Sequence, residues 1–345
     1  MKLVRTEDAV GQVLCHDITQ IIPGVVKDAV FRKGHIVTKE DIPVLLSVGK
    51  ENLYIWEKQE GMLHENEAAE ILRQICQGEH MHPSEVKEGK IELIADCEGV
   101  LKINTEKLNA VNNLGEMMIA SRHGNFPVKT GDKIAGTRII PLVIEEEKMQ
   151  KACEVAGKET IFRILPYQKK KAGIVTTGSE VYYHRIEDKF TPVVIEKLKE
   201  CGVTEVKQIQ CNDDHEMIME AIQTLIEDGS DLIVCTGGMS VDPDDRTPLA
   251  IKNACMEVVT YGAPVLPGAM FMLAYCEKEG RQIPVMGLPG CVMYAKRTIF
   301  DLVLPRIMCD EKLHEKDFRL LGQGGLCLSC PVCTFPNCGF GKGGY

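Results

Sequence analysis

Three apolar runs in the second half of the chain end in glycine-containing loops. The runs are AGIVTTG from Ala172, DLIVCTGG from Asp231 and QIPVMGLPG from Gln282. They lack polar alternation, which is typical of strands buried on both faces, and segments with helical periodicity separate them. Strands that alternate with helices form parallel sheets with ligands at their carboxyl ends. We therefore predict an α/β domain over residues 171–310, in which helices flank a mostly parallel sheet.

The remaining residues divide by pattern into four further segments. We expect an N-terminal α+β unit over 1–83, a small β-rich domain over 84–145, a linker helix and hinge over 146–170, and a Cys-rich tail over 322–345. Apolar residues at helical spacing predict a helix that Thr38 caps and Gly49 ends, and a second helix over His64–Gln77. The alternation around Leu53 and Ile55 predicts a strand.

Composition and charge exclude two broad classes of protein. The chain has 345 residues with 40 Lys and Arg against 50 Asp and Glu, a formal charge of 40 − 50 = −10. A nucleic-acid binder is usually basic, so we expect no nucleic-acid partner. No apolar run reaches membrane-spanning length, and the first residues lack an apolar signal core. We therefore expect no membrane association and a cytoplasmic protein.

The loops that follow the predicted strands carry small and hydroxylated residues. Such residues let backbone N–H groups approach a phosphate or a flat heterocycle closely. Each loop taken alone is equally compatible with an ordinary glycine turn. The candidate ligand-binding residues are Thr177, Gly178, Ser179, Gly237, Gly238, Ser240, Pro289 and Gly290.

Carboxylates gather in the same loops. Glu180 follows the first loop, and Asp242, Asp244 and Asp245 stand within four residues after the double glycine. Neighbouring carboxylates repel unless water, a proton or a cation such as Mg²⁺ offsets their charge. Asp242 and Asp245 are therefore candidate metal ligands, with a solvated turn as the alternative. Asp213 has the alternative role of a helix N-cap, in a capping box with Glu216.

The fifteen cysteines fall into two groups. Eleven are scattered and are interpreted as buried thiols. The last four, Cys327, Cys330, Cys333 and Cys338, lie within twelve residues, where a short glycine-rich loop could wrap one metal. Four thiolates suit Zn²⁺ or an iron–sulfur cluster. We expect too few apolar residues here to order the segment without metal, and the alternative is a flexible tail that binds none.

The order and spacing of TTGSE, the helix after Asp213, DLIVCTGGMSVDPDD, Pro267-Gly268 and GLPG resemble the molybdopterin molybdenumtransferases. These proteins carry a molybdopterin-binding domain of the MoaB/Mog type. The resemblance covers about residues 172–309 and, more weakly, 1–57.

The resemblance implies binding of molybdopterin, in adenylated form, and Mg²⁺-dependent insertion of molybdate. It implies catalytic roles for Glu180, Asp213 and Asp245, and cofactor binding by the loop residues named above. It also implies a homodimer and a molybdoenzyme as client.

Three departures from the family pattern leave alternatives open. The segment 265–270 lacks the lysines that flank the family's Pro-Gly, Cys291 and Val292 replace Asn and Pro, and a Met-Asp-Gly-Tyr segment is missing. A non-catalytic molybdopterin carrier or a sensor is therefore the alternative to the enzyme. At the start of a helix Cys291 is either a low-pKa thiolate near the metal or a small buried residue. Candidate basic ligands for the anion are Arg246, Lys296 and Arg297.

Overall fold

The computed structural model describes residues 2–22, 26–55, 60–240, 242–243 and 245–343. The chain forms two compact units. The first comprises Met1–Asp96, Ile103–Arg122 and Thr130–Arg163, and the second comprises Cys97–Lys102, His123–Lys129 and Ile164–Tyr345. No helix in the described ranges is long and apolar enough to cross a membrane.

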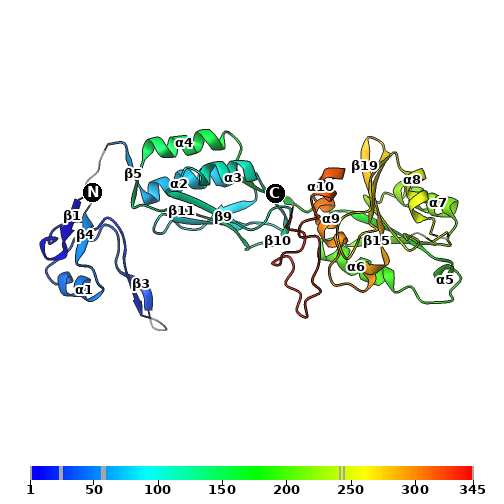
Figure 1. Ribbon diagram of the computed structural model, residues 1–345, viewed down its shortest axis with the longest axis horizontal. Helices are drawn as coiled ribbons and strands as arrows, with labels where there is room; N and C mark the ends of the chain where they lie inside the picture. The colour runs from blue at the N-terminus through cyan, green and yellow to red at the C-terminus, as the bar shows by residue number, and fades with distance from the viewer. Residues whose placement is uncertain (1, 23–25, 56–59, 241, 244, 344–345) are drawn as a thin grey trace. The chain divides into compact units, whose positions relative to one another are not determined.

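The first unit combines small sheets with three longer helices. Its sheets pair β1 with β4, β2 with β3 and β12 with β5, and a four-stranded sheet has the order β6-β7-β11-β9. Figure 1 shows α2, α3 and α4 along one face of the sheet that contains β9 and β11. The elements are β1 Lys2–Arg5, η1 Thr6–Asp8, β2 Ile18–Ile22, β3 Val26–Phe31, α1 Asp41–Ser47, β4 Asn52–Ile55, β5 Met62–His64, α2 Glu65–Cys76, β6 Met81–Pro83, β7 Lys90–Ala95, α3 Thr105–Asn112, β9 Met117–Ser121, β11 Lys133–Ile139, β12 Val143–Glu145 and α4 Glu146–Ala156.

Several elements of the first unit follow directly from the residue pattern. Helix α2 buries Ala68, Leu72 and Ile75, the apolar stripe that predicted it. Strand β4 alternates exposed and buried residues, with Leu53 and Ile55 inside. Helix α3 was not predicted, because TEKLNAVN is short and mostly polar; the Asn104 side chain caps it by accepting a hydrogen bond from the Lys107 N–H.

The second unit is built on one six-stranded sheet with the order β15-β14-β16-β19-β18-β17. Strands β15, β14, β16 and β19 are parallel, and β18 and β17 are antiparallel. The elements are β14 Lys171–Thr177, α5 Ser179–Tyr182, α6 Phe190–Glu200, β15 Glu205–Cys211, α7 His215–Glu227, β16 Leu232–Thr236, α8 Thr247–Ala254, β17 Glu257–Tyr261, β18 Met272–Lys278, β19 Arg281–Leu288, η2 Gly290–Met293, α9 Ile299–Met308 and α10 Glu315–Arg319. A three-stranded sheet, β10-β8-β13, uses Pro127–Val128, Gly99–Ile103 and Phe162–Pro166, most of which belong to this unit.

Both faces of the six-stranded sheet are buried, which explains the apolar runs that predicted it. In β14, Ile174 packs into the core that contains α6 and α9, whereas Val175 packs into the core that contains α7 and α8. Strand β16 repeats this alternation with Val234 and Cys235. A strand buried on both faces has no polar positions, so period-two alternation is absent from the sequence. The predicted mostly parallel α/β fold is confirmed.

The last helix of the sheet domain is shorter than predicted. We expected one helix from about Val292 to Met308, but a single 3₁₀ turn, η2, ends at Met293 and α9 begins only at Ile299. The Thr298 side chain accepts from the Phe300 N–H, and Asp301 accepts from the Thr298 N–H at 2.7 Å. This capping box starts a new helix and turns the chain at residues 294–298.

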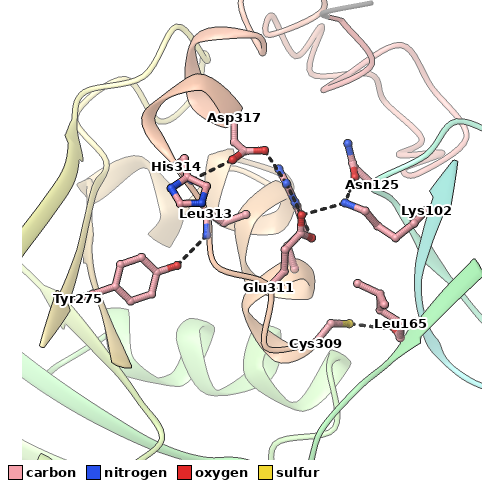
Figure 2. A network of polar contacts seen from close by, with 10 residues as sticks. Lys102, Asn125, Leu165, Tyr275, Cys309, Glu311, Leu313, His314 and Asp317 are labelled. Atoms are coloured by element: carbon pink, nitrogen blue, oxygen red, sulfur yellow. Dashed lines mark hydrogen bonds and ion pairs between the residues drawn. The ribbon is translucent and has the colours of Figure 1, made fainter. Parts of the chain in front are cut away.

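A charged network holds the chain that follows α9 (Figure 2). Glu311 accepts from Arg306 at 2.6 Å and from Lys102 at 2.8 Å. Arg306 also donates to Asp317 at 2.6 Å, and Tyr275 Oη accepts from the Leu313 N–H at 2.9 Å. Burial alone would raise the pKa of Glu311, but the Arg306 and Lys102 partners outweigh it and lower that pKa. Two cations and two anions offset one another here, so the network can be largely buried.

Candidate functional site

The carboxyl ends of the four parallel strands meet at one edge of the sheet. The register aligns Thr177 with Cys211, Thr176 with Thr236, and Thr236 with Leu288. The TTGSE loop, the Asp213 loop, the double-glycine loop and GLPG therefore all begin at this edge. The parallel register brings together residues that lie more than a hundred positions apart in the sequence.

Threonine hydroxyls connect the loops that follow β14 and β16. Thr177 Oγ1 donates to the Thr236 carbonyl at 3.1 Å and lies 3.1 Å from Thr247 Oγ1. Gly178, in a conformation with φ of +131°, then redirects the chain into α5. Thr177 thus holds the start of one loop against its neighbour.

The double glycine is required by close packing within the protein. Gly237 and Gly238 have φ values of +90° and +55°. A Cβ on Gly237 would lie 2.4 Å from the Thr177 carbonyl oxygen, and one on Gly238 would lie 2.8 Å from Thr247 Oγ1. Both glycines allow the loop after β16 to pass directly over the end of β14. The glycines were expected to leave room for a ligand, but the close contacts found are with the protein's own Thr177 and Thr247.

Further hydroxyl side chains belong to the strand ends and loops of this edge. Thr236 Oγ1 is buried and is the one side-chain N or O atom among the buried atoms of the described chain that has no hydrogen-bond partner. A buried hydroxyl without a hydrogen-bond partner lowers the stability of the fold. Thr236 directly precedes the double glycine, so this unpaired hydroxyl lies at the start of a candidate ligand-binding loop. Ser179 is half-buried, and Ser240 is exposed. This donor set fits a polar heterocycle or a phosphate.

The structure separates the roles of two adjacent aspartates. Asp214, and not Asp213, is the N-cap of α7, because its side chain accepts from the Glu216 and Met217 N–H groups, both at 3.0 Å. The predicted capping box of Asp213 with Glu216 is therefore wrong, and the cap lies one residue later at Asp214. Asp213 instead accepts from the Ser179 N–H at 2.8 Å, which ties the second loop to the first.

The remaining carboxylates lie on neighbouring loops without forming a metal-binding cluster. Asp242 and Asp245 form one turn: the Asp242 N–H donates to Asp245 Oδ2 at 3.2 Å, and the Asp245 N–H donates to the Asp242 carbonyl at 2.9 Å. Glu180 is exposed, and Asp244 lies outside the described residues. Within the described ranges no three His, Cys, Asp or Glu side chains are arranged to hold a metal ion.

A polar cluster beneath the edge was missed by the sequence argument. Gln208 Nε2 donates to Thr176 Oγ1 and to Asp188 Oδ2, both at 2.9 Å. Asp188 also accepts from the Thr191 N–H at 3.0 Å. Burial would raise the pKa of Asp188, but these hydrogen bonds outweigh it and hold the pKa below its usual value. An acid two residues before the start of α6 at Phe190 was the available signal.

The GLPG loop forms a closely packed boundary of the edge. Pro289 is buried and Gly290 is exposed. A Cβ on Gly287 would lie 2.6 Å from Met239 Sδ, so this loop also packs against the double-glycine loop. Burial raises the pKa of the Cys291 thiol, and η2 is a single 3₁₀ turn. The interpretation of Cys291 as a low-pKa thiolate at a helix start is therefore wrong.

Two of the three basic candidates are engaged elsewhere. Arg297 donates to Glu200 at 2.7 Å and to Asp301 at 2.8 Å. Lys296 donates to the Pro331 carbonyl at 2.9 Å. Arg246 is exposed at the N-cap of α8; the hydrogen bond from the Met217 N–H lowers the pKa of Asp214 most, and the Arg246 charge adds to this. Of the three, Arg246 is the cation that this edge can offer to an anion.

The segment that holds lysines in the resembling family has another role here. The Leu266 N–H donates to the Gly325 carbonyl, and the Cys327 N–H donates to the Leu266 carbonyl, both at 2.8 Å. A Cβ on Gly268 would lie 2.5 Å from Ile299 Cγ2. The Pro267-Gly268 segment thus pairs with the cysteine-rich residues and packs on α9.

Two family models match the chain. Residues 173–308 match a probable molybdopterin binding domain, and residues 3–57 match a domain of unknown function. The CinA-like protein of Mycobacterium sp. (strain MCS) is 35% identical over 85 residues, which are 25% of this chain and 20% of that protein. The CinA-like protein of Mycobacterium avium (strain 104) is 34% identical over 95 residues, 28% and 22% of the two chains. The chain thus spans about a fifth of the length of these curated relatives.

Solved structures match over about two fifths of the chain. The tungsten cofactor synthesizing protein MoaB from Pyrococcus furiosus has 23% identity and a TM-score of 0.32, covering 36% of this chain and 84% of that one. The molybdopterin biosynthesis Mog protein from Mycobacterium ulcerans has 19% identity and a TM-score of 0.32, covering 40% and 92%. The protein CinA from Thermoplasma acidophilum has 16% identity and a TM-score of 0.34, covering 41% and 98%.

Proposed function

We propose that this chain, whose residues 173–308 belong to the family of probable molybdopterin binding domains, binds molybdopterin at the carboxyl edge of its six-stranded sheet. The single observation that carries this proposal is the convergence of TTGSE, TGGMS and GLPG at that edge through parallel register. The hydroxyls of Ser179 and Ser240 would bind polar groups of the ligand, and Arg246 would attract its phosphate.

The binding proposal has a direct test with a matched control. Protein purified from a host that makes the cofactor should release a fluorescent oxidised pterin on acid treatment. Arg246→Ala should weaken molybdopterin binding by about 10- to 150-fold, since a hydrogen bond to a charged group contributes about 1.5–3 kcal/mol. Arg281→Ala, which removes an exposed cation from the start of β19, should not change it. Repeated absence of pterin, together with no binding of added molybdopterin, would refute the proposal.

We further propose that the protein assists molybdate insertion into adenylated molybdopterin. Glu180, Asp213 and Asp245 lie on three loops of the same edge but are not grouped as a metal site in the described chain, so they would hold Mg²⁺ only if a bound ligand drew the loops together. A bound Mg²⁺ would supply charge stabilisation at the phosphate. Asp213 already links its loop to Ser179, so it would position the first loop as well. A molybdoenzyme would receive the product, and a homodimer is the proposed assembly.

A specific observation favours the carrier as a second candidate. The Leu266–Gly268 segment is engaged by Gly325, Cys327 and Ile299, and no lysine stands beside Pro267. Lys296 and Arg297 are also bound to other groups. Few cations are then left to bind molybdate. Turnover of adenylated molybdopterin that depends on both molybdate and Mg²⁺ would favour the enzyme, and tight binding without turnover would favour the carrier.

A further inference from the structure

The cysteine-rich segment is anchored to the second unit at both of its ends. At one end, backbone hydrogen bonds join Leu266 to Gly325 and Cys327. At the other end, Phe340 is 4% exposed within the core that contains α9, and Phe335 packs against the same core. The expectation that no apolar contact could order this segment is therefore wrong, because its two phenylalanines join an existing core.

The residues between the anchors lack such packing. Leu328 is 79% exposed and Val332 is 76% exposed, although both are large apolar side chains. Cys330 and Cys333 are exposed free thiols on the same loop. One contact joins this loop to the rest of the unit: the Lys296 ammonium donates a hydrogen bond to the Pro331 carbonyl. Residues 328–334 thus form a loop that is fixed at its base and exposed along its length.

All four cysteines of the segment line one cavity. This cavity of about 570 Å³ is bordered by Cys327, Cys330, Cys333 and Cys338. Cys327 and Cys338 are half-buried near the anchored ends, and all four are free thiols. The cations Lys296 and Arg297 line the same cavity. Two thiols are therefore held in place by the fold, and two more face the same space from the exposed loop.

We propose that these four cysteines bind one Zn²⁺ ion. The balanced step is the loss of four thiol protons and the formation of four Zn–S bonds, which leaves a tetrathiolate centre with two negative charges. The Lys296 ammonium, which donates to a backbone carbonyl, offsets part of that charge from the cavity wall, whereas the charge of Arg297 is already offset by Glu200 and Asp301. The thiols do not yet converge in the described chain, so binding closes loop 328–334 onto Cys327 and Cys338. Zinc suits this exposed position because it undergoes no redox change.

The test uses the full chain, stripped of metal by chelation under a thiol reductant and then titrated with Zn²⁺ against a chromophoric chelator. We expect about one Zn²⁺ per chain, and protection of loop 328–334 from proteases when zinc is bound. Cys330→Ser should weaken zinc binding by about 100-fold or more, since metal binding supplies the energy that orders the loop. Cys153→Ser, which removes an exposed free thiol from α4, is the matched control and should bind zinc normally.

Two results would overturn this proposal. One is the absence of stoichiometric zinc binding with equal protease cleavage in the presence and absence of zinc. The other is anaerobically purified protein that carries an iron–sulfur chromophore on the same cysteines. Cys330→Ser should leave molybdopterin binding unchanged, because the proposed pterin residues lie on other loops. Failure of the zinc proposal is thus distinguishable from failure of the proposed function.

Discussion

The carboxyl edge of the sheet and the cysteine-rich segment differ in how their candidate ligands are held. At the edge, Thr177, Gly237 and Gly238 are fixed by contacts between adjacent loops, so their positions follow from the sheet register. In the segment, Phe335 and Phe340 fix the ends, while Cys330 and Cys333 lie on an exposed loop. The edge is organised without a ligand, whereas the loop of the segment would be completed only by the zinc ion proposed above.

The largest stability effect is expected at an anchor of the segment. Phe340→Ala should lower the free energy of unfolding of the second unit by about 3–5 kcal/mol, because it leaves a cavity in the core. Leu328→Ala, on the exposed loop between the anchors, should change it by less than about 0.5 kcal/mol. Urea unfolding followed by circular dichroism measures both variants. Equal losses of unfolding free energy in the two variants would contradict the distinction between packed anchors and an exposed loop.

Glu311 holds the chain that follows α9 through its contacts with Arg306 and Lys102. Glu311→Gln should cost roughly 2–3 kcal/mol at neutral pH, because it leaves Arg306 and Lys102 without their shared partner. The folded pKa of Glu311 lies below its usual value of 4.5, so its contribution is present above that value and is lost as pH falls through the folded pKa. The difference between wild type and variant should therefore shrink in acid. Glu315→Gln, at an exposed helix position, is the control and should show no such trend.

Glycine substitutions test the close packing of the edge. Gly237→Ala should destabilise the second unit by about 2–3 kcal/mol and abolish molybdopterin binding, since both the positive φ and the contact with Thr177 oppose a side chain. Gly229→Ala has a similar φ of +88° with no atom near its Cβ, so it should cost only about 1 kcal/mol and retain binding. Thermal unfolding measures the stability of both variants, and titration with molybdopterin measures their binding. Equal losses would mean that backbone strain alone, and not loop packing, sets the cost.

The smallest stability effect is expected at the carboxylate turn. Asp245→Asn should change the free energy of unfolding by less than about 0.5 kcal/mol, because this residue makes one turn contact at 3.2 Å. Mg²⁺-dependent activity, or affinity for molybdopterin, should nevertheless fall. Asp228→Asn, at the exposed C-cap of α7, should alter neither. If the Asp245→Asn variant binds and reacts normally, Asp245 contributes only to the turn and not to ligand or Mg²⁺ binding.

Much of the sheet domain could be predicted because its pattern is regular. Apolar runs that end in glycine loops and alternate with helices predict a parallel sheet, and that topology alone places the loops at one edge. Local packing could not be predicted in the same way. The exchange of roles between Asp213 and Asp214 depends on where the Ser179 N–H lies, and the break before α9 depends on the Thr298–Asp301 capping box. Both depend on geometry that one-dimensional spacing does not contain.

The sequence by itself determined the fold class, the order of the motif loops and the presence of four clustered cysteines. The tertiary structure alone decided which groups remain available to a ligand. Arg297 is paired with Asp301, and Leu266 is paired with the cysteine-rich segment, although both stand within or beside family-like motifs. The physical reason is that a hydrogen bond or an ion pair depends on distance in space, and distant parts of the chain compete for the same polar groups.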